Sequence, residues 1–537
     1  MFDTTQYSRR RLLKIGAVGA VGVGALSVPL GRAAAGKQAS RLKSANFPKP
    51  YQATFQRPPV LQPSSSTVDG DGITTNFYTV TESQSTAQIV PGLTTPVWGY
   101  NGSVPGPTIS LEQGTRAVLK VRNQLPALHP AFGHPFDTST HLHGSASLPQ
   151  YDGYASDVTA PGYVKDYRYP NFQPARTLWY HDHGVHFTAQ NAYGGLAAQY
   201  HLHDPVERAL LPQGEFDVPI TITDAMFAEN GTLSYDDHTE SGLWGDIVLV
   251  NGRPWPVMQV KRRVYRFRVL NASISRSYKP QLGSGDPMTV VATDGGLMPV
   301  AKTVTSYRHG NAERYEILID FSRYPVGKRV ELKNLSNKNN IDYDDTGKIM
   351  AFDVVDGPFD STNNTIPTTL ASSPVMSLTA ANAVRTRKMA VERTSAGEWS
   401  ISGKTWHDVI DSGFDLVVAN PAVDDVEIWE IENRSGGWFH PVHIHLVDFQ
   451  ILSRKLGSNN PIAPYDYEKG PKDVVYIGEN ETVKVLMRFE HQRGKYMMHC
   501  HNLPHEDHDM MQQFSVGLQS PDPNDPINAD PARPDTP

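Results

Sequence analysis

Apolar and polar residues alternate with a period of two along several stretches of the chain, which is typical of β-strands. The clearest are residues 115–125 (TRAVLKVRNQL), 262–272 (RRVYRFRVLNA), 313–321 (ERYEILIDF) and 481–489 (ETVKVLMRF). In the second stretch Arg266 and Arg268 share one face with Val264 and Leu270, and Tyr265, Phe267 and Val269 share the other. We therefore expect a strand with one buried face.

The spacing of turn residues predicts an all-β chain. No long helical periodicity follows residue 36, and 43 Gly and 41 Pro favour many short strands joined by turns. The 537 residues are enough for three sandwiches or barrels. Stretches 203–217 and 356–375 are the expected linkers. We place the domains at 36–205, 206–360 and 361–518, and we expect a disordered tail at 519–537.

The N-terminus resembles a twin-arginine export signal. Residues 8–14 (SRRRLLK) contain Arg9 and Arg10, and an apolar stretch then leads to Ala33-Ala34-Ala35. A membrane anchor is the alternative, but the stretch is short and rich in small residues. We therefore expect residues 1–35 to be cleaved, with export by the twin-arginine machinery to the periplasm or outside the cell and no stable membrane anchoring.

Charge and cysteine usage narrow the function further. The formal net charge of −7 gives no indication of nucleic-acid binding. The chain has one cysteine, Cys500, so no intramolecular disulfide can form. That is typical of the cytoplasm. Twin-arginine export, however, carries folded proteins, often with the cofactor bound, and so fits a metalloprotein without disulfides.

Ten of the 20 histidines gather in four short clusters. They are HLHG (His141, His143), HDH (His181, His183), HPVHIH (His440, His443, His445) and HCHNLPH (His499, His501, His505). Residues two apart on a strand face the same side, so each His-x-His pair presents two imidazoles to one point. Imidazole binds Cu, Zn, Fe and Ni, and eight paired imidazoles are too many for one ion. The remaining pair, His201 and His203, is interpreted as structural.

Cys500 should serve a different site from its neighbours. If residues 499–501 are extended, its side chain points away from the two flanking imidazoles. The candidate partners there are His440, His505 and either Met510 or Met511. Two His, one Cys and a weak axial Met form the trigonal blue-copper set. Zinc fits less well, because structural zinc prefers a closed set of four ligands, usually with more cysteine.

The four clusters resemble the copper motifs of the multicopper oxidases, H-x-H-G, H-x-H, H-P-x-H-x-H and H-C-H-x(3)-H-x(4)-M, in this order and with every position filled. The likeness covers roughly residues 70–517 and is greatest to bilirubin oxidases and spore-coat-type bacterial laccases. It rests on segments such as 178–200 (LWYHDHGVHFTAQNAYGGLAAQY) and 440–454 (HPVHIHLVDFQILSR). The resemblance implies three cupredoxin-like Greek-key β-barrels, with a trinuclear cluster between the first and the third.

The same resemblance implies four copper ions and their ligands. The type 1 copper would take His440, Cys500, His505 and Met510, which favours Met510 over Met511. The type 2 copper would take His141 and His443. The type 3 pair would take His143, His181, His183, His445, His499 and His501, and their division between the two ions stays open.

Two acids match positions that related enzymes use to relay protons. Asp152 lies eleven residues after His141, and Glu506 follows His505. Reduction of O2 to water consumes protons, so a buried site needs an acid path. The alternatives are that Asp152 caps the turn QYDGY and that Glu506 is solvated. Trp438, two residues before His440, would place an indole beside the type 1 copper or would only pack.

The expected function is an exported, monomeric oxidase. It would couple one-electron oxidation of phenols, aromatic amines or a tetrapyrrole such as bilirubin to the reduction of O2 to water. The alternatives are an oxidase of Cu(I) or Mn(II), a copper-free structural relative in the cell envelope, and a copper carrier or electron-transfer protein. The 13 Met are spread out rather than gathered in a Cu(I)-binding insert. A copper-free relative would have lost copper ligands, and this chain has every ligand position filled. A copper carrier would need only the type 1 set.

Overall fold

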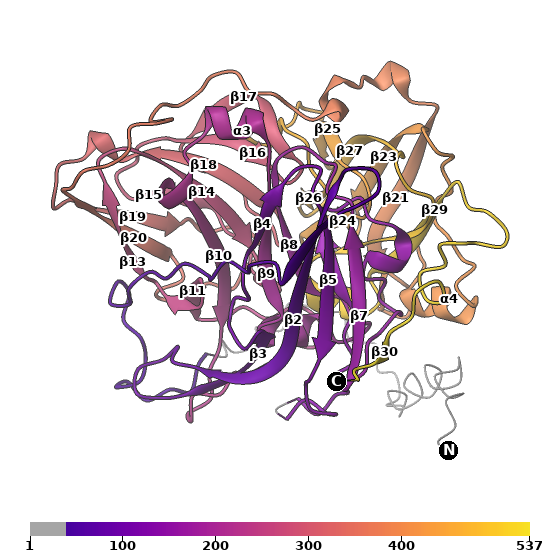
Figure 1. The fold of residues 1–537 in the computed structure, drawn as a ribbon, viewed down its shortest axis with the longest axis horizontal. Helices are drawn as coiled ribbons and strands as arrows, with labels where there is room; N and C mark the ends of the chain where they lie inside the picture. The colour runs from indigo at the N-terminus through magenta and orange to yellow at the C-terminus, as the bar shows by residue number, and fades with distance from the viewer. Residues whose placement is uncertain (1–38, 131, 537) are drawn as a thin grey trace. The chain divides into compact units, whose positions relative to one another are not determined.

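The computed structural model describes residues 39–130 and 132–536, so the expected signal peptide at 1–35 lies outside the described residues. In this part the chain forms three barrels, each built from two β-sheets. Figure 1 shows the strands coloured along the chain, from indigo through magenta and orange to yellow. The fold is all-β and consists of cupredoxin-like barrels, as the sequence predicts.

The first barrel carries the first two histidine clusters. One sheet has the order β1 (Ser65–Val68), β2 (Thr74–Ala87), β5 (Arg116–Asn123), β7 (Tyr163–Tyr169) and β30 (Arg533–Pro534), and β3 (Thr95–Tyr100) also pairs with β2. The other has the order β4 (Ile109–Glu112), β9 (Ala197–His203), β8 (Arg176–Asp182) and β6 (Thr140–His143). Leu119, Leu142 and Leu178 lie in the buried core between them.

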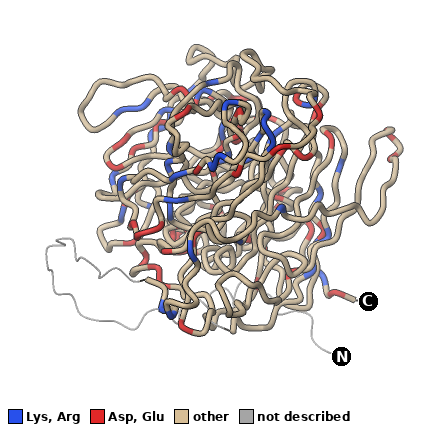
Figure 2. The backbone as a smooth tube through the Cα atoms, turned by 90° about the vertical axis from the view of Figure 1, so that its left-hand side faces the viewer, with Lys and Arg blue, Asp and Glu red and all other residues tan. Residues whose placement is uncertain are grey.

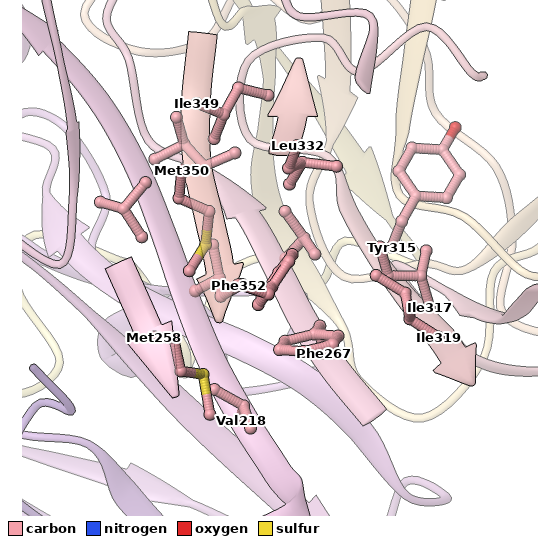
Figure 3. Close-up of a cluster of buried hydrophobic side chains, with 14 of the residues drawn as sticks. Val218, Met258, Phe267, Tyr315, Ile317, Ile319, Leu332, Ile349, Met350 and Phe352 are labelled. Carbon is pink, nitrogen blue, oxygen red and sulfur yellow. The ribbon is translucent and has the colours of Figure 1, made fainter. Parts of the chain in front are cut away.

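The second barrel contains no predicted ligand. Its larger sheet has the order β12 (Arg253–Pro254), β11 (Ile247–Val250), β10 (Asp217–Ala225), β14 (Val264–Asn271), β18 (Arg314–Asp320), β16 (Met288–Thr293) and β17 (Gly296–Val304). Its smaller sheet has the order β13 (Val257–Lys261), β20 (Lys348–Val355), β19 (Arg329–Asn334) and β15 (Pro280–Leu282). Phe267, Ile317 and Phe352 pack in its core (Figure 3).

The third barrel carries the last two histidine clusters and the cysteine. One sheet has the order β22 (Trp399–Ile401), β21 (Arg385–Arg393), β23 (Val426–Asn433), β27 (Glu481–Arg488) and β25 (Phe449–Leu456). The other has the order β26 (Val474–Ile477), β24 (His440–Ile444), β28 (Gly494–Cys500) and β29 (Met511–Val516). Cys500 and Met510 belong to the buried cluster between the sheets.

The three barrels share one strand arrangement. In each, a parallel pair is followed by an antiparallel neighbour: β2, β5 and β7 in the first, β10, β14 and β18 in the second, and β21, β23 and β27 in the third. The predicted strands at 115–125, 262–272, 313–321 and 481–489 are confirmed as β5, β14, β18 and β27. Strands β5 and β14 take the second place in this arrangement, and β18 and β27 take the third. All four lie inside their sheets, where burial makes the alternation easiest to recognise.

Helices are short and lie between strands. They are α2 (Thr188–Gly194), α3 (Pro205–Leu210), α4 (Trp406–Asp411) and α5 (Leu503–Asp507), with 3-10 turns η1 (Pro149–Tyr151), η2 (Gly214–Phe216), η3 (Phe321–Arg323), η4 (Pro374–Ser377), η5 (Ala380–Asn382) and η6 (Asp466–Glu468). Among residues 39–536, apart from 131, no helix has the length and apolar character needed to cross a membrane.

The prediction that β14 has one buried face is wrong, because both of its faces are buried. Arg266 and Arg268 point into the contact between the first two barrels, where they pair with Glu207 of α3 and Glu316 of β18. A period-two pattern predicts that its charged side chains are exposed. Here acids from two barrels neutralise the two arginines, so they can be buried. Positive and negative positions are interspersed along the backbone in Figure 2.

Both ends of the described chain pack differently from the expectation. Residues 40–57 were placed in domain 36–205, yet they contact the second barrel: Tyr51 N–H donates to Trp255 O at 2.9 Å, and Phe55 N–H to Val257 O at 2.9 Å. The tail at 519–537 is ordered as far as it is described, contrary to the expected disorder. Its strand β30 pairs with β7 (Figure 1). The tail is polar, but it adds to an existing sheet edge and needs no core of its own.

Candidate metal centre

Paired strands bring the His-x-His motifs together. In the first barrel β6 runs antiparallel to β8, with His141 opposite His181. In the third barrel β24 runs antiparallel to β28, with His443 opposite His499. Since alternate residues of a strand share a face, each sheet directs its imidazoles to one side. His183, His445 and His501 lie just beyond the strand ends.

The eight imidazoles of these pairs form one buried cluster between the first and third barrels. The rings of His143 and His443 stack with centroids 3.6 Å apart, and those of His141 and His445 stack at 4.0 Å. His499 Nε2 lies 3.1 Å from both His183 Nε2 and His445 Nε2. Ligand-type atoms lie within 4.8 Å of one another in several triplets, among them His141–His143–His181 and His183–His445–His499.

Each imidazole is oriented so that a nitrogen faces the cluster. His181 Nδ1 donates to Asp182 O at 2.7 Å and His443 Nδ1 to Asp473 O at 2.8 Å, while His141 Nδ1 is bonded to Asp152 O. The Nε2 atoms of these three rings and of His501 are buried without a hydrogen-bond partner. His143 is reversed: Nε2 is bonded to Asp473, and Nδ1 has no partner.

Burial favours the neutral form of seven of these rings. It lowers the pKa of His181 to about 3 and that of His183 to about 4, and neighbouring imidazoles add to the effect. The pKa values of His141, His143, His443, His445 and His501 are also held well below the ordinary value, chiefly by burial. A metal ion binds neutral imidazole, so these seven rings need no deprotonation to accept one.

The two predicted acids both touch the cluster. Asp152 Oδ2 accepts a hydrogen bond from His445 Nδ1 at 2.7 Å, and burial raises the pKa of this carboxyl well above its usual range. Glu506 Oε2 lies 2.8 Å from His499 Nδ1, and Oε1 lies 3.5 Å from His183 Nδ1. Burial alone would raise the pKa of Glu506, but His499 and His183 lower it to about 2. Glu506 is 2% exposed, so the solvated alternative is wrong.

Cys500 lies on the opposite face of β28 from His499 and next to His440 and His505. Its Sγ is 3.3 Å from His440 Nδ1 and 3.7 Å from His505 Nδ1, and these two nitrogens are 3.2 Å apart. Burial raises the pKa of the thiol. Without a cation the sulfur would therefore keep its proton, whereas a coordinating thiol is deprotonated by its metal.

Strand pairing separates the two methionines. His499 lies opposite Met511 in β28 and β29, and the next pair brings Met510 opposite Cys500, with Cys500 N–H donating to Met510 O at 3.1 Å. Met510 packs in the same buried cluster as Cys500. Met511 packs in a different cluster with Trp406. The methionine on the thiol side is therefore Met510.

Aromatic rings cover the cysteine site. Trp399 lies against His505 with ring centroids 4.0 Å apart. The Arg393 guanidinium lies over the Trp399 ring, 3.7 Å from its centroid. Trp438 is half-buried and meets His505 edge-on at 5.7 Å. His505 Nε2 donates to Ser241 O of the second barrel at 3.0 Å. The indole of Trp438 thus lies beside this site, as the sequence suggested.

Sequence reasoning missed Asp473 and Trp399. Asp473 holds two imidazoles of the cluster, and Trp399 lies against the imidazole of His505 at the cysteine site. Neither belongs to a local motif, so no spacing pattern could have found them. His201 and His203, interpreted as structural, bond to Gln199 and Glu207.

Comparison with known proteins gives the family. Multicopper oxidase profiles match residues 81–207 and 382–520. The chain is 41% identical over 477 residues to the bilirubin oxidase of Albifimbria verrucaria, which covers 86% of this chain and 80% of that protein. The chain belongs to the multicopper oxidase family. It is also 34% identical over 494 residues to a laccase of Bacillus subtilis, covering 82% and 94% of the two chains.

The family also fits the fold and the metal chemistry. The crystal structure of a laccase from Pediococcus acidilactici matches with a TM-score of 0.75 at 30% identity, over 89% of this chain and 95% of that one. As a multicopper oxidase, the protein is an oxidoreductase that uses O2 and a reductant and carries one type 1, one type 2 and two type 3 copper ions. The unpartnered imidazole nitrogens and the buried thiol are a donor set that fits these ions.

Proposed function

We propose that this multicopper oxidase is exported and oxidises aromatic reductants one electron at a time at its cysteine site. The observation that carries the proposal is the placement of Cys500. Its thiol lies between His440 and His505, while the residues on either side of it, His499 and His501, belong to the eight-imidazole cluster. A site that accepts electrons is therefore joined by peptide bonds to a site that can bind O2.

The geometry supports the ligand roles that the family resemblance implies. His440, Cys500, His505 and Met510 would hold the type 1 copper, and His141 and His443 the type 2 copper. His143, His181, His183, His445, His499 and His501 would hold the type 3 pair. The copper ions, when bound, would supply the one-electron redox chemistry that couples oxidation of the reductant to the four-electron, four-proton reduction of O2 to water.

Asp152 and Glu506 would relay the protons that this reduction consumes. Asp152 hydrogen-bonds to His445 on one side of the cluster, and Glu506 contacts His499 and His183 on the other. Because both carboxyl groups are buried, a proton that reaches the cluster from either can be transferred without bulk water. We therefore assign Asp152 and Glu506 as the residues through which protons reach the imidazole cluster.

The reductant would approach the cysteine site near Trp438, which is half-buried beside His505. An indole face suits flat aromatic donors, because aromatic rings stack favourably. Phenols, aromatic amines and tetrapyrroles such as bilirubin are the proposed donors. An oxidase of Cu(I) or Mn(II) is the second candidate, and the scattered methionines do not favour it.

The test is a copper count and an absorption spectrum of the copper-loaded protein, followed by oxygen uptake. We expect four coppers per chain, an intense blue band, and faster uptake with bilirubin or a simple phenol than with Mn(II) or Cu(I). Oxygen uptake with the metal ions alone would favour the second candidate. A colourless protein would exclude the assignment of Cys500.

We further propose that the protein reaches the cell exterior or the periplasm through the twin-arginine machinery and acts as a monomer. The support is the sequence of residues 8–14 with Arg9 and Arg10, together with a copper set that requires a folded protein. Cell fractionation and size-exclusion chromatography test these two points.

A further inference from the structure

Arg314 of the second barrel reaches a residue that orients two imidazoles of the copper cluster. Its Nη1 donates to Asp473 Oδ1 at 2.7 Å and its Nη2 to Asp473 Oδ2 at 2.6 Å. Asp473 in turn accepts a hydrogen bond from His143 Nε2 on its carboxylate, at 3.1 Å, and one from His443 Nδ1 on its main-chain oxygen, at 2.8 Å. One residue of the third barrel therefore holds a ring from the first barrel and a ring from the third.

The guanidinium of Arg314 is fully buried, and each of its donors has an acceptor. Besides Asp473, it donates from Nε to Thr177 O at 2.9 Å, from Nη1 to Ala312 O at 3.1 Å and from Nη2 to Asp294 O at 3.1 Å. Together with Asp473, these acceptors come from all three barrels. A lysine has three donors on one nitrogen and cannot reproduce this planar fork.

Asp294 fixes the main chain on the other side of Asp473. Its Oδ2 accepts from the N–H of Asp473 at 3.3 Å and of Val474 at 3.2 Å, and it pairs with Lys472 Nζ at 2.9 Å. The second barrel thus controls both the side chain and the peptide unit of Asp473. Both groups are bonded to an imidazole of the cluster.

Gly144 leaves the space that the pair of Arg314 and Asp473 occupies. A Cβ at this position would lie 2.7 Å from Arg314 Nη2, 2.7 Å from Asp473 Oδ2 and 2.7 Å from Leu178 Cδ2. Its φ of +90° also disfavours other residues. The glycine that ends the motif HLHG is therefore required by this ion pair, as well as by its own backbone conformation.

We propose that Arg314 is a positioning residue for the trinuclear copper cluster. By clamping Asp473, it fixes His143 with Nδ1 toward the metal and His443 with Nε2 toward the metal. The second barrel supplies no ligand but in this way sets the geometry of two ligands from the other barrels. The inference rests on the proposed ligand roles of His143 and His443. Groups that bond to ligand imidazoles typically change metal affinity by about 10- to 100-fold when removed.

The test compares Arg314→Lys with Arg268→Lys. Arg268 is a matched control, because it is also fully buried, also crosses between the first two barrels by donating to Thr177 Oγ1 at 3.0 Å, and contacts no predicted ligand. We expect Arg314→Lys to release type 2 copper to a chelator faster than the unsubstituted protein, by up to the about 10- to 100-fold typical of losing a group that bonds directly to a ligand imidazole. Its type 2 EPR signal should change, and its blue band should stay. Arg268→Lys should lower the melting temperature and leave copper release unchanged.

Asp473→Asn keeps the main-chain acceptor and the side-chain shape. It is the second test of the positioning role, to be used if Arg314→Lys does not fold. It should also speed copper release and alter the type 2 EPR signal. Unchanged release and EPR in Arg314→Lys, or in Asp473→Asn where the first variant does not fold, would overturn the inference. So would equal loss of copper in Arg268→Lys. If the unsubstituted protein itself lacks a type 2 signal, the proposed ligand roles fail instead.

Discussion

Replacing Met510 or Met511 with leucine tests which of two adjacent residues is the axial ligand. Both side chains are buried, Met510 on the Cys500 face of the third barrel and Met511 against Trp406. A Met-to-Leu exchange conserves volume and usually costs less than about 1.5 kcal/mol. Both variants should therefore fold, and a difference between them reports on the copper site rather than on packing.

The expected effect is on the type 1 reduction potential. A weak sulfur donor stabilises oxidised copper more than reduced copper, so Met510→Leu should raise the potential. Each roughly 1.4 kcal/mol of lost differential stabilisation corresponds to about 59 mV in a one-electron couple. We expect a rise on the order of 60 mV for Met510→Leu and no change for Met511→Leu, measured by redox titration of the blue band. A shift in Met511→Leu with none in Met510→Leu would refute the assignment.

Three other predictions concern the thiol, acid stability and export. Cys500→Ser should abolish the blue band and the oxidation of organic substrates while the imidazole cluster still binds copper; a blue, active variant would contradict the whole assignment. Burial alone would raise the pKa of Glu316, but Arg266 and Arg268 lower it to about 2. At pH values above its unfolded pKa of about 4.5, Glu316 should therefore add up to roughly 3 kcal/mol to the free energy of unfolding. This contribution should be lost as the pH falls toward 2. Glu316→Gln should flatten that part of the curve of melting temperature against pH, and an unchanged acid limb would count against it. Replacing Arg9 and Arg10 with Lys should keep the precursor in the cytoplasm, and normal export of that variant would exclude the twin-arginine route.

Local pattern was enough to predict the central strands and the grouping of the histidines. A period of two is a property of a few consecutive residues, so β14 and β27 could be recognised without tertiary information. The spacing of His141 and His143 likewise fixes their common face on one strand. The placement of Cys500 on the other face followed from the same rule.

What could not be predicted depends on contacts between distant segments. Arg266 was expected on an open face, because no local feature indicates that Glu207 and Glu316 would enclose it. Asp473 lies 330 residues from His143 and 159 from Arg314, so neither contact leaves a pattern in the sequence. The ordered tail was missed for the same reason, since its stability comes from the edge of β7 and not from its own composition.

The register of β28 determines both the imidazole cluster and the cysteine site at once. Strand β28 lies between β24 and β29. The main-chain N–H of Cys500 donates to Met510 O on one side, and the N–H of His501 donates to Pro441 O on the other, at 2.6 Å. A slip of one residue would turn every side chain of a strand to the opposite face. The thiol would then enter the imidazole cluster, and His499 would enter the cysteine site. Because β28 would supply the proposed ligands of both sites from its two faces, neither site can be formed correctly without the other.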